Sequence, residues 1–332
     1  MSLLKPRFVF KPFEYEEAFN YWEMQQNVHW LPSEVSMSKD IADWMNKMTD
    51  AEKNVVGNVL KGFTQTEVVV QDYWTNMVTQ WFPKPEIAMM ATAFGAMETV
   101  HATGYAYLND SLGLDDYDSF IQEPTVKAKI DRLTDVPDKK NKKHIARSLA
   151  IFSAFTEGVN LFSSFAILMS FSLSNKLKGM KQIVSWSIRD ESLHSKAGCW
   201  LFRTFIKENP GIWTDDLKRD IYEAAHLTVK LEEDFIDKCF ELGSIENLDP
   251  NDLKQYIRYR TNTKLQDIML KPVIEVQDKE AVERLHWFDV LSSGKEFQDF
   301  FAQQPTTYSK GVNNKWTIDH IFEGVADDDR RA

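Results

Sequence analysis

The sequence predicts an all-α fold, a bundle of long helices around an apolar core. Inside a helix, proline removes a backbone hydrogen bond and clashes with the preceding turn. Proline is absent from four long stretches: 33–82, 86–123, 138–209 and 211–249. These stretches are rich in Ala, Leu, Met, Phe and Lys. None shows the alternation of Val and Ile between Asn-Gly or Asp-Gly turns that is typical of sheet proteins.

Proline, glycine and polar clusters separate the expected helices. The breaks fall at WFPKPE (81–86), LNDSLGLDDYDSF (108–120), DVPDKKNKK (135–143), SNKLKG (174–179) and ENPG (208–211). We expect helices of about 20 to 30 residues between these breaks. The helical pattern ends near Ser292. We therefore expect residues 1–300 to form one domain, followed by a flexible tail, 301–332, that contains Tyr308 and Trp316.

Charge and cysteine content limit the classes of function. The 39 basic and 50 acidic side chains give a net charge of -11, which argues against nucleic acid or an anionic membrane as the main partner. The two cysteines, Cys199 and Cys239, lie in helical patterns, so we expect no disulfide framework and a reducing compartment. The N-terminal segment has no apolar run of signal-peptide length, and no stretch is apolar enough for a membrane span. We expect a cytoplasmic protein.

The spacing Glu-x-x-His carries the strongest chemical signal. It places both side chains on one face of a helix, one turn apart, where they can bind the same metal ion. The sequence contains this spacing four times. Two pairs lie on apolar helix faces, as metal ligands inside a bundle would: Glu98/His101 and Glu191/His194. The other two lie among charged residues or in a short segment near the tail, and we interpret them as surface pairs: Glu223/His226 and Glu283/His286.

Two further acids, Glu67 and Glu157, lie in apolar surroundings. A buried carboxylate without a partner is costly, and Glu157 is the one charged residue between Arg147 and Lys176. Two helices that each give one Glu, with two that each give Glu-x-x-His, match the ligand pattern of di-iron and di-manganese carboxylate proteins. Four carboxylates and two neutral imidazoles offset most of the charge of two divalent ions, so such residues can be buried together.

Several segments in order resemble the radical-generating small subunit of class I ribonucleotide reductase, a ferritin-like family. They are HWLPSEV (29–35), the lone acid Glu67, METVHATGY (97–105), FTEGVNLFSSF (155–165) and IRDESLHSKAG (188–198). The resemblance runs from residue 12 to about residue 310 and implies a ferritin-like helical bundle with a dimetal-carboxylate site. It implies two metal ions, Fe/Fe, Mn/Fe or Mn/Mn, with six ligands: Glu67, Glu98, His101, Glu157, Glu191 and His194.

The resemblance also implies residues that store and transfer a radical. Tyr105, one helical turn after His101, matches the position of the tyrosyl radical in many members. Asp190 matches the hydrogen-bond partner of the His101 imidazole, and Trp30 matches the next station on the electron path. Tyr308 matches the tail tyrosine that relays the radical across the subunit interface.

The sequence leaves open where the oxidising equivalent is stored. Some members lack the radical tyrosine or store the equivalent on the metals, and HWLPSEV resembles those branches. Leu161 stands where familiar iron members carry Phe. Both Tyr105 and the metal centre are therefore candidates for storage, and the identity of the metals stays open.

Ribonucleotide reduction by this chemistry requires a thiyl radical and a redox-active thiol pair, which two cysteines in helical contexts cannot supply. The expected partner is therefore a large catalytic subunit. We expect a β subunit of ribonucleoside-diphosphate reductase, which serves deoxyribonucleotide synthesis and acts only with that large subunit. A homodimer is expected, and an activating flavoprotein is a candidate partner. The alternatives are a stand-alone dimetal oxygenase or oxidase, with a substrate cavity beside the metals, and an iron-binding ferritin-like protein.

Overall fold

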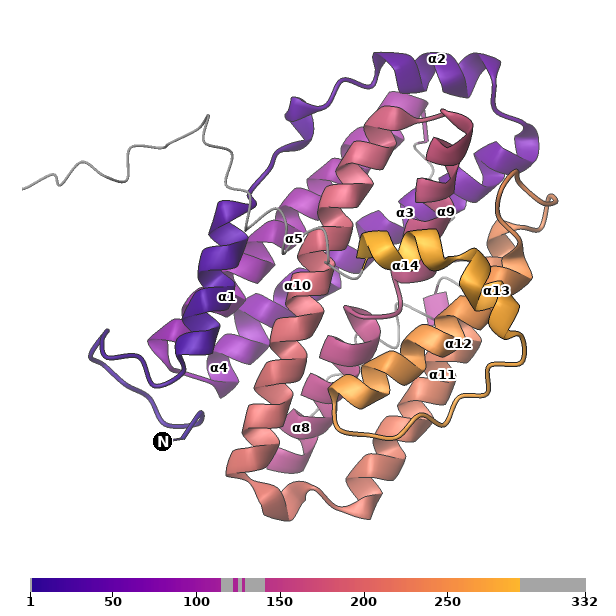
Figure 1. The fold of residues 1–332 in the computed structure, drawn as a ribbon. Coiled ribbons are helices and arrows are strands. Elements are labelled where there is room, and N and C mark those ends of the chain that lie inside the picture. Colours follow the sequence, from indigo (N-terminus) through magenta and orange to yellow (C-terminus); the bar gives the residue numbers. More distant parts are fainter. Residues whose placement is uncertain (1, 115–121, 125–126, 129–140, 293–332) are drawn as a thin grey trace, which may run out of the picture. The chain divides into compact units, whose positions relative to one another are not determined.

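Four helical segments pack against one another in the described part of the chain and contain its core (Figure 1). Three are continuous: α3 (Asp50–Asp72), α5 (Pro85–Leu112) and α10 (Lys178–Glu208). The fourth is interrupted and consists of α8 (Lys142–Ala150), η3 (Ile151–Thr156) and α9 (Phe162–Ser170). Helix α3 packs along α5, and α10 contacts α5 and every part of the interrupted segment. The all-α prediction is confirmed, since the described residues contain no β-strand.

The computed structural model describes residues 2–114, 122–124, 127–128 and 141–292. All of these residues belong to one structural unit, Met1–Gly294. The predicted tail, 301–332, lies outside the described residues together with Tyr308 and Trp316. The domain boundary predicted at residue 300 lies outside them as well and stays a prediction.

Local signals explain where the central helices begin and end. Helix α3 starts with a capping box, in which Thr49 Oγ1 accepts a hydrogen bond from the Glu52 amide and the Glu52 carboxylate accepts one from the Thr49 amide. Helix α5 has Pro85 at its first position and ends at Gly113, whose φ of 71° is left-handed. The break predicted at 81–86 therefore lies between α4 (Thr79–Trp81) and α5, whereas the break predicted at 108–120 begins only after Leu112.

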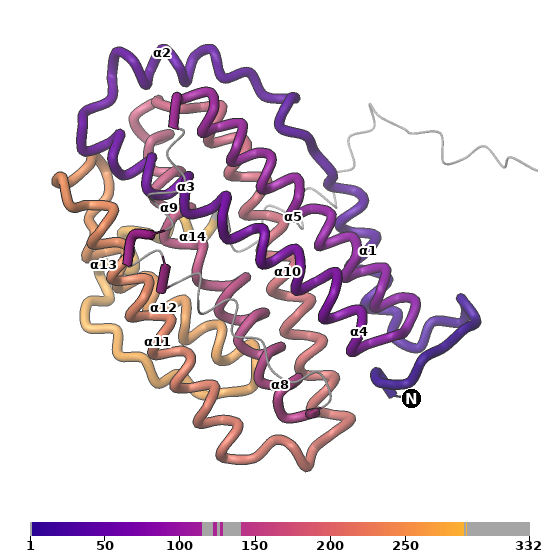
Figure 2. The backbone as a smooth tube through the Cα atoms, turned by 180° about the vertical axis from the view of Figure 1, so that it is seen from behind, coloured from indigo at the N-terminus to yellow at the C-terminus, as the bar shows by residue number. Residues whose placement is uncertain are grey.

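Further helices cover the sides and one end of the bundle, with α2 lying across that end (Figures 1 and 2). Helix α1 (Glu16–Asn27) packs on α5 and α10, and α2 (Ser38–Asn46) contacts the same two helices. Helices α11 (Asp215–Cys239) and α12 (Pro250–Asp267) pack together and cover the interrupted segment. No helix in the described part of the chain is both long and apolar enough to cross a membrane. The remaining short elements are η1 (Pro32–Glu34), η2 (Tyr73–Val78), η4 (Phe171–Ser174), η5 (Pro210–Ile212), α13 (Lys279–Arg284) and α14 (His286–Ser292).

The interrupted segment differs from the long helix expected between residues 143 and 174. Its middle part, η3, is a π-helix, and residues 157–161 form turns before α9 begins. Two contacts bind this irregular stretch to its neighbours. Ser195 Oγ on α10 donates to the carbonyl of Ser153 at 2.7 Å, and Arg260 Nε on α12 donates to the carbonyl of Gly158 at 2.6 Å. Tertiary contacts thus satisfy backbone groups that a regular helix would pair internally.

Candidate metal centre

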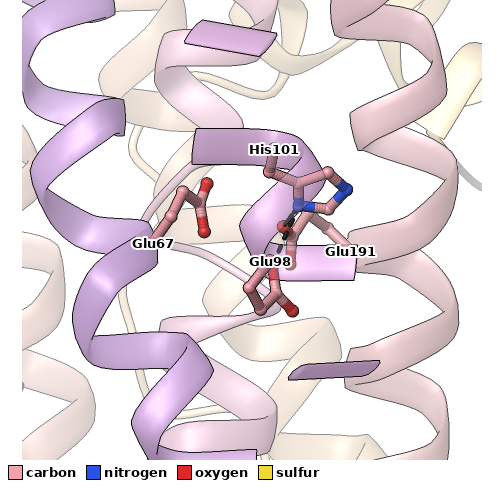
Figure 3. A group of neighbouring side chains, drawn as sticks. All are labelled: Glu67, Glu98, His101 and Glu191. Atoms are coloured by element: carbon pink, nitrogen blue, oxygen red, sulfur yellow. Dashed lines mark ion pairs between the residues drawn. The ribbon is translucent and has the colours of Figure 1, made fainter. Parts of the chain in front are cut away.

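Four carboxylates and two imidazoles meet in the centre of the bundle. The four helical segments all contribute, and each of the six side chains is at most 1% exposed. Figure 3 shows how the carboxylate of Glu67 on α3 faces three side chains from α5 and α10. The six residues are Glu67 from α3, Glu98 and His101 from α5, Glu157 from the turn after η3, and Glu191 and His194 from α10.

The six residues form two overlapping groups, each with four ligand atoms that lie within 4.8 Å of one another. Glu98 and Glu191 belong to both groups. Glu67 and His101 complete the first group, and the second is completed by two other residues, Glu157 and His194. This arrangement suits two metal positions that share two carboxylates.

The polar atoms of the cluster are close together but are not aligned for hydrogen bonding. Nδ1 of His194 lies 2.7 Å from Glu98 Oε1, and Nδ1 of His101 lies 2.9 Å from Glu98 Oε2 and 3.0 Å from Glu191 Oε1. Nonetheless, nine buried oxygen and nitrogen atoms of the six residues have no hydrogen-bond partner among the residues that the structure describes. Buried polar atoms without partners are rare in proteins. Seven carboxylate oxygens and two imidazole nitrogens that converge in this way form a donor set that suits iron and manganese.

Burial and mutual repulsion perturb the acids of the cluster. Burial, together with the charge of Glu98, raises the pKa of Glu191 to about 8 and the pKa of Glu67 well above its usual value. Burial and Glu191 raise the pKa of Glu157 in the same way. Burial also acts to raise the pKa of Glu98, but the two imidazoles outweigh it and hold that pKa at about 2. The acids thus repel one another, and a cation between them would relieve this repulsion.

The outer nitrogens of both imidazoles belong to one hydrogen-bond network. Nε2 of His101 lies 3.2 Å from Asp190 Oδ2, which also accepts a 2.8 Å hydrogen bond from Trp30 Nε1. Nε2 of His194 lies 2.9 Å from Gln25 Oε1. The amide nitrogen of Gln25 donates to Asp190 Oδ1 at 3.3 Å. Asp190 and Trp30 thus lie beside His101, and the network extends to His194.

Sequence reasoning missed two residues of this region, Gln25 and Trp74. Gln25 lies on the buried face of α1 together with Ala18 and Tyr21, so a polar residue at an apolar helical position was the available signal. Trp74 lies in the same apolar segment as Glu67, so the sequence gives no signal that separates it from an ordinary core residue. It is fully buried, but its Nε1 also donates a 2.6 Å hydrogen bond to Glu157 Oε1.

Tyr105 is fully buried next to the cluster. The centroid of its ring lies 4.6 Å from that of Phe63 and 6.4 Å from that of His101. Its hydroxyl has no hydrogen-bond partner in the described part of the chain. Burial and the nearby charge of Glu67 raise the pKa of Tyr105 well above its usual value, so the phenol is held neutral.

The other two Glu-x-x-His pairs lie away from the centre. All four side chains are exposed, as their charged surroundings in the sequence indicated: Glu223, His226, Glu283 and His286. An exposed charged side chain stays hydrated and has no burial cost, so no metal ion is needed to explain these two pairs.

Comparison with known proteins identifies the family. Residues 7–281 match the family model described as "Ribonucleotide reductase, small chain". The chain belongs to this family. Among small chains, it is 34% identical to a probable ribonucleoside-diphosphate reductase small subunit of Invertebrate iridescent virus 6, over 97% of this chain and 99% of the relative. It is 24% identical to the ribonucleoside-diphosphate reductase subunit beta of Chlamydia pneumoniae, over 92% and 91% of the two chains.

Solved structures of small chains share the fold. The ribonucleotide reductase R2 subunit from Clostridium botulinum has a TM-score of 0.76 at 20% identity, covering 84% of this chain and 89% of its own. The dimanganese(II) NrdF of Streptococcus sanguinis has a TM-score of 0.74 at 20% identity, covering 86% and 99%. The ferritin-like helical bundle predicted from the sequence is confirmed.

Family membership also confirms the predicted function as the small chain of ribonucleoside-diphosphate reductase. It implies that the small chain works with a large chain and forms a dimer. The predicted alternatives, a stand-alone oxygenase and an iron-storage protein, are therefore set aside. The buried carboxylate and histidine cluster suits a dimetal site in this small chain.

Proposed function

We propose that the six clustered residues ligate two metal ions, and that this small chain uses the ion pair to generate and store a one-electron oxidant for the large chain. The large chain then reduces ribonucleotides to deoxyribonucleotides. One observation supports the proposal above all others: six residues form two overlapping groups of ligand atoms, and nine of their buried polar atoms have no hydrogen-bond partner among the described residues. When bound, two redox-active ions would react with dioxygen or a reduced oxygen species and so supply the oxidising power that no side chain of this cluster has by itself.

Each ligand has a distinct place in this proposal. Glu98 and Glu191 belong to both groups and would be shared between the ions. Glu67 would bind one ion only, and Glu157 the other. The two imidazoles would bind through Nδ1, because their Nε2 atoms are already engaged with Asp190 and Gln25.

Tyr105 is our candidate for the side chain that carries the radical. It is buried beside His101, and its unpartnered hydroxyl lies in a site closed to solvent, which would protect a radical from quenching. Storage on the metals themselves is the other candidate. The two are distinguished by electron paramagnetic resonance of the Tyr105→Phe variant, in which a tyrosyl signal would be absent and a metal-centred signal retained.

Asp190 and Trp30 are proposed to carry the oxidising equivalent away from the centre. The hydrogen bonds His101–Asp190 and Asp190–Trp30 form a continuous connection. The ring of Trp30 is stacked on the imidazole at an interplanar angle of 23° and a centroid distance of 5.9 Å. The partly exposed Trp186 follows at 5.2 Å from Trp30. In our proposal Tyr308 of the tail then relays the equivalent to the large chain.

The identity of the ions belongs to the same proposal. Carboxylate and imidazole ligands suit iron and manganese alike, so Fe/Fe, Mn/Fe and Mn/Mn centres are all compatible with this donor set. The structurally similar small chain of Streptococcus sanguinis is described as a dimanganese(II) protein. An activating flavoprotein is a further candidate partner. Cytoplasmic location stays a prediction from the sequence.

The ligand assignment is tested by metal analysis of two variants, Glu157→Ala and His194→Ala. We expect wild-type protein to bind two ions per chain and each variant to lose at least one. Ribonucleotide reduction should appear in wild-type protein only when a large chain is added, and in neither variant. Circular dichroism should show an unchanged helical content, because the apolar core of the bundle does not depend on the ions.

A matched control is His226→Ala. His226 has the same Glu-x-x-His spacing but is exposed on α11, so this variant should bind both ions. Full metal occupancy in both Glu157→Ala and His194→Ala would contradict the ligand assignment.

A further inference from the structure

The carboxylate of Asp190 is surrounded by four donors. Oδ2 accepts from Trp30 Nε1 at 2.8 Å and from His101 Nε2 at 3.2 Å. Oδ1 accepts from Gln25 Nε2 and from Arg189 Nε, both at 3.3 Å. A carboxylate has about four lone-pair sites, so the acceptor capacity of this fully buried group is used completely.

This saturation determines which way the side-chain amide of Gln25 points. The indole of Trp30 and the guanidinium of Arg189 are obligatory donors, and a carboxylate with four donors around it acts only as an acceptor. Gln25 must therefore present its NH2 group to Asp190. Its carbonyl oxygen then faces Nε2 of His194, 2.9 Å away.

The amide orientation in turn determines the tautomer of His194. A carbonyl oxygen can only accept, so Nε2 of His194 must carry the hydrogen, and Nδ1 presents its lone pair to the cluster. The same reasoning applies directly at His101, whose Nε2 donates to Asp190. The reverse tautomer of His194 would place an N–H on Nδ1, towards Glu98 Oε1 at 2.7 Å, where it would block a metal ion.

We propose that Gln25 is a positioning residue of the metal centre. Its NH2 group donates to Asp190 and its carbonyl oxygen accepts from His194, so that the Asp190 carboxylate determines the tautomers of both imidazoles. This inference rests on the proposed metal-binding function. Residues that orient a ligand imidazole in this way typically change metal affinity by about 10- to 100-fold when they are removed.

The first test compares Mn²⁺ binding to wild-type protein and to Gln25→Met, which keeps the length of the side chain but has no amide. Isothermal titration should show two ions bound to both proteins, with the affinity for one ion lowered by about 10- to 100-fold in the variant. Gln26→Met is the matched control, because Gln26 is the next residue of α1 and is exposed. It should bind both ions as wild-type protein does.

The second test is a double-mutant cycle with Asp190→Asn. An asparagine at this position can keep its oxygen towards Trp30 and His101, but then its NH2 faces Gln25 and forces the Gln25 amide to turn. The turned amide would present NH2 to His194 and favour the blocking tautomer. Asp190→Asn should therefore lower the affinity for the ion bound by His194, because the asparagine oxygen still accepts from His101. The double variant should bind the metal ions no more weakly than Asp190→Asn alone. Without the Gln25 amide, the substitution at Asp190 cannot change the tautomer of His194.

The outcomes separate the inference from the function on which it rests. If wild-type protein does not bind two ions, the proposed metal centre fails and the inference fails with it. If wild-type protein binds two ions and Gln25→Met keeps both affinities within about twofold, or if the two substitutions act independently, the inference alone is wrong. Gln25→Leu is used in the same way if Gln25→Met does not show the helical content of the wild type.

Discussion

Trp74 holds one oxygen of Glu157 and leaves the other without a partner. Its indole Nε1 donates a 2.6 Å hydrogen bond to Oε1, while Oε2 makes no hydrogen bond in the described part of the chain. The ring itself is fixed by edge-on packing against Phe94 and His194, at centroid distances of 5.1 and 6.2 Å. A rigid aromatic donor therefore orients a carboxylate that lies on an irregular turn.

Trp74→Phe should weaken metal binding without unfolding the protein. Phenylalanine keeps much of the packing but cannot donate, so Glu157 loses the contact that directs Oε2 towards the cluster. We expect the affinity for one of two Mn²⁺ ions to fall by about 10-fold, measured by titration calorimetry. Trp81→Phe is the control, because Trp81 is also buried but its Nε1 has no hydrogen-bond partner in the part of the chain that the structure describes. Equal metal affinities in the two variants would refute the role of the hydrogen bond.

The metal-free protein should lose stability as the pH rises from about 4.5 to 8. The pKa of Glu191 is raised from 4.5 to about 8, first by burial and then by Glu98. In this range the folded state holds a proton that the unfolded state has released, so the free energy of unfolding falls with rising pH. Burial raises the pKa values of Glu67 and Glu157 in the same direction.

Two acids with lowered pKa values, Asp43 and Glu52, do not reverse this trend. The pKa values of Asp43 and Glu52 are lowered by their lysine partners against the effect of burial, and the stability that they contribute is already complete above pH 5. Urea denaturation of chelator-treated protein at pH 5 and pH 8 measures the effect. The manganese-loaded protein should show a much smaller pH dependence, because the ions replace the protons. A metal-free protein that is more stable at pH 8 than at pH 5 would contradict the prediction.

The sequence was sufficient to predict the bundle and the residues that meet in its centre. Glu98 and Glu191 stand one turn before a histidine on apolar helix faces, and periodicity alone indicates that such faces are buried. Glu67 and Glu157 were recognisable because an isolated acid in an apolar segment needs a partner. Each of these signals is local to one helix.

Contacts between helices could not be predicted in the same way. Gln25 reaches Asp190 and His194 from a helix more than 160 positions away in the sequence. The irregular stretch around Glu157 contains no proline, and its interruption depends on contacts from α10 and α12. Such features follow from tertiary packing, which overrides local helix propensity.

Arg260 should stabilise the turn that carries Glu157. It is 7% exposed, its Nε donates to the carbonyl of Gly158 at 2.6 Å, and its guanidinium lies 3.2 Å from the centroid of the Phe162 ring. Arg260→Met would leave that carbonyl without its donor. We expect a loss of about 1 to 3 kcal/mol in the free energy of unfolding, measured in urea, and weaker binding of one metal ion.

The control for this variant is Arg258→Met on the same helix. Arg258 forms a partly exposed ion pair with Glu233 at 2.6 Å. This pair does not involve the turn that carries Glu157. Pairs of this kind contribute roughly 0 to 1 kcal/mol, so the substitution should change stability little and leave metal affinity unchanged. If both arginine variants bound two ions with wild-type affinity, Arg260 would have only a structural role.

The final prediction concerns Tyr308 in the predicted tail, outside the described residues. Deleting residues 301–332 should leave metal binding intact, since all six proposed ligands precede the deletion. Turnover with the large chain should be lost, because a polar tail that binds a partner would be missing. Tyr308→Phe is the sharper variant. Phenylalanine keeps the ring for docking but lacks the phenolic O–H group, whose loss of a proton and an electron forms a tyrosyl radical. A pull-down should therefore still recover the large chain while turnover is abolished. If Tyr308→Phe retained near-normal turnover, the relay would belong to another residue, and Trp316, the other isolated aromatic singled out in the tail, would be tested next.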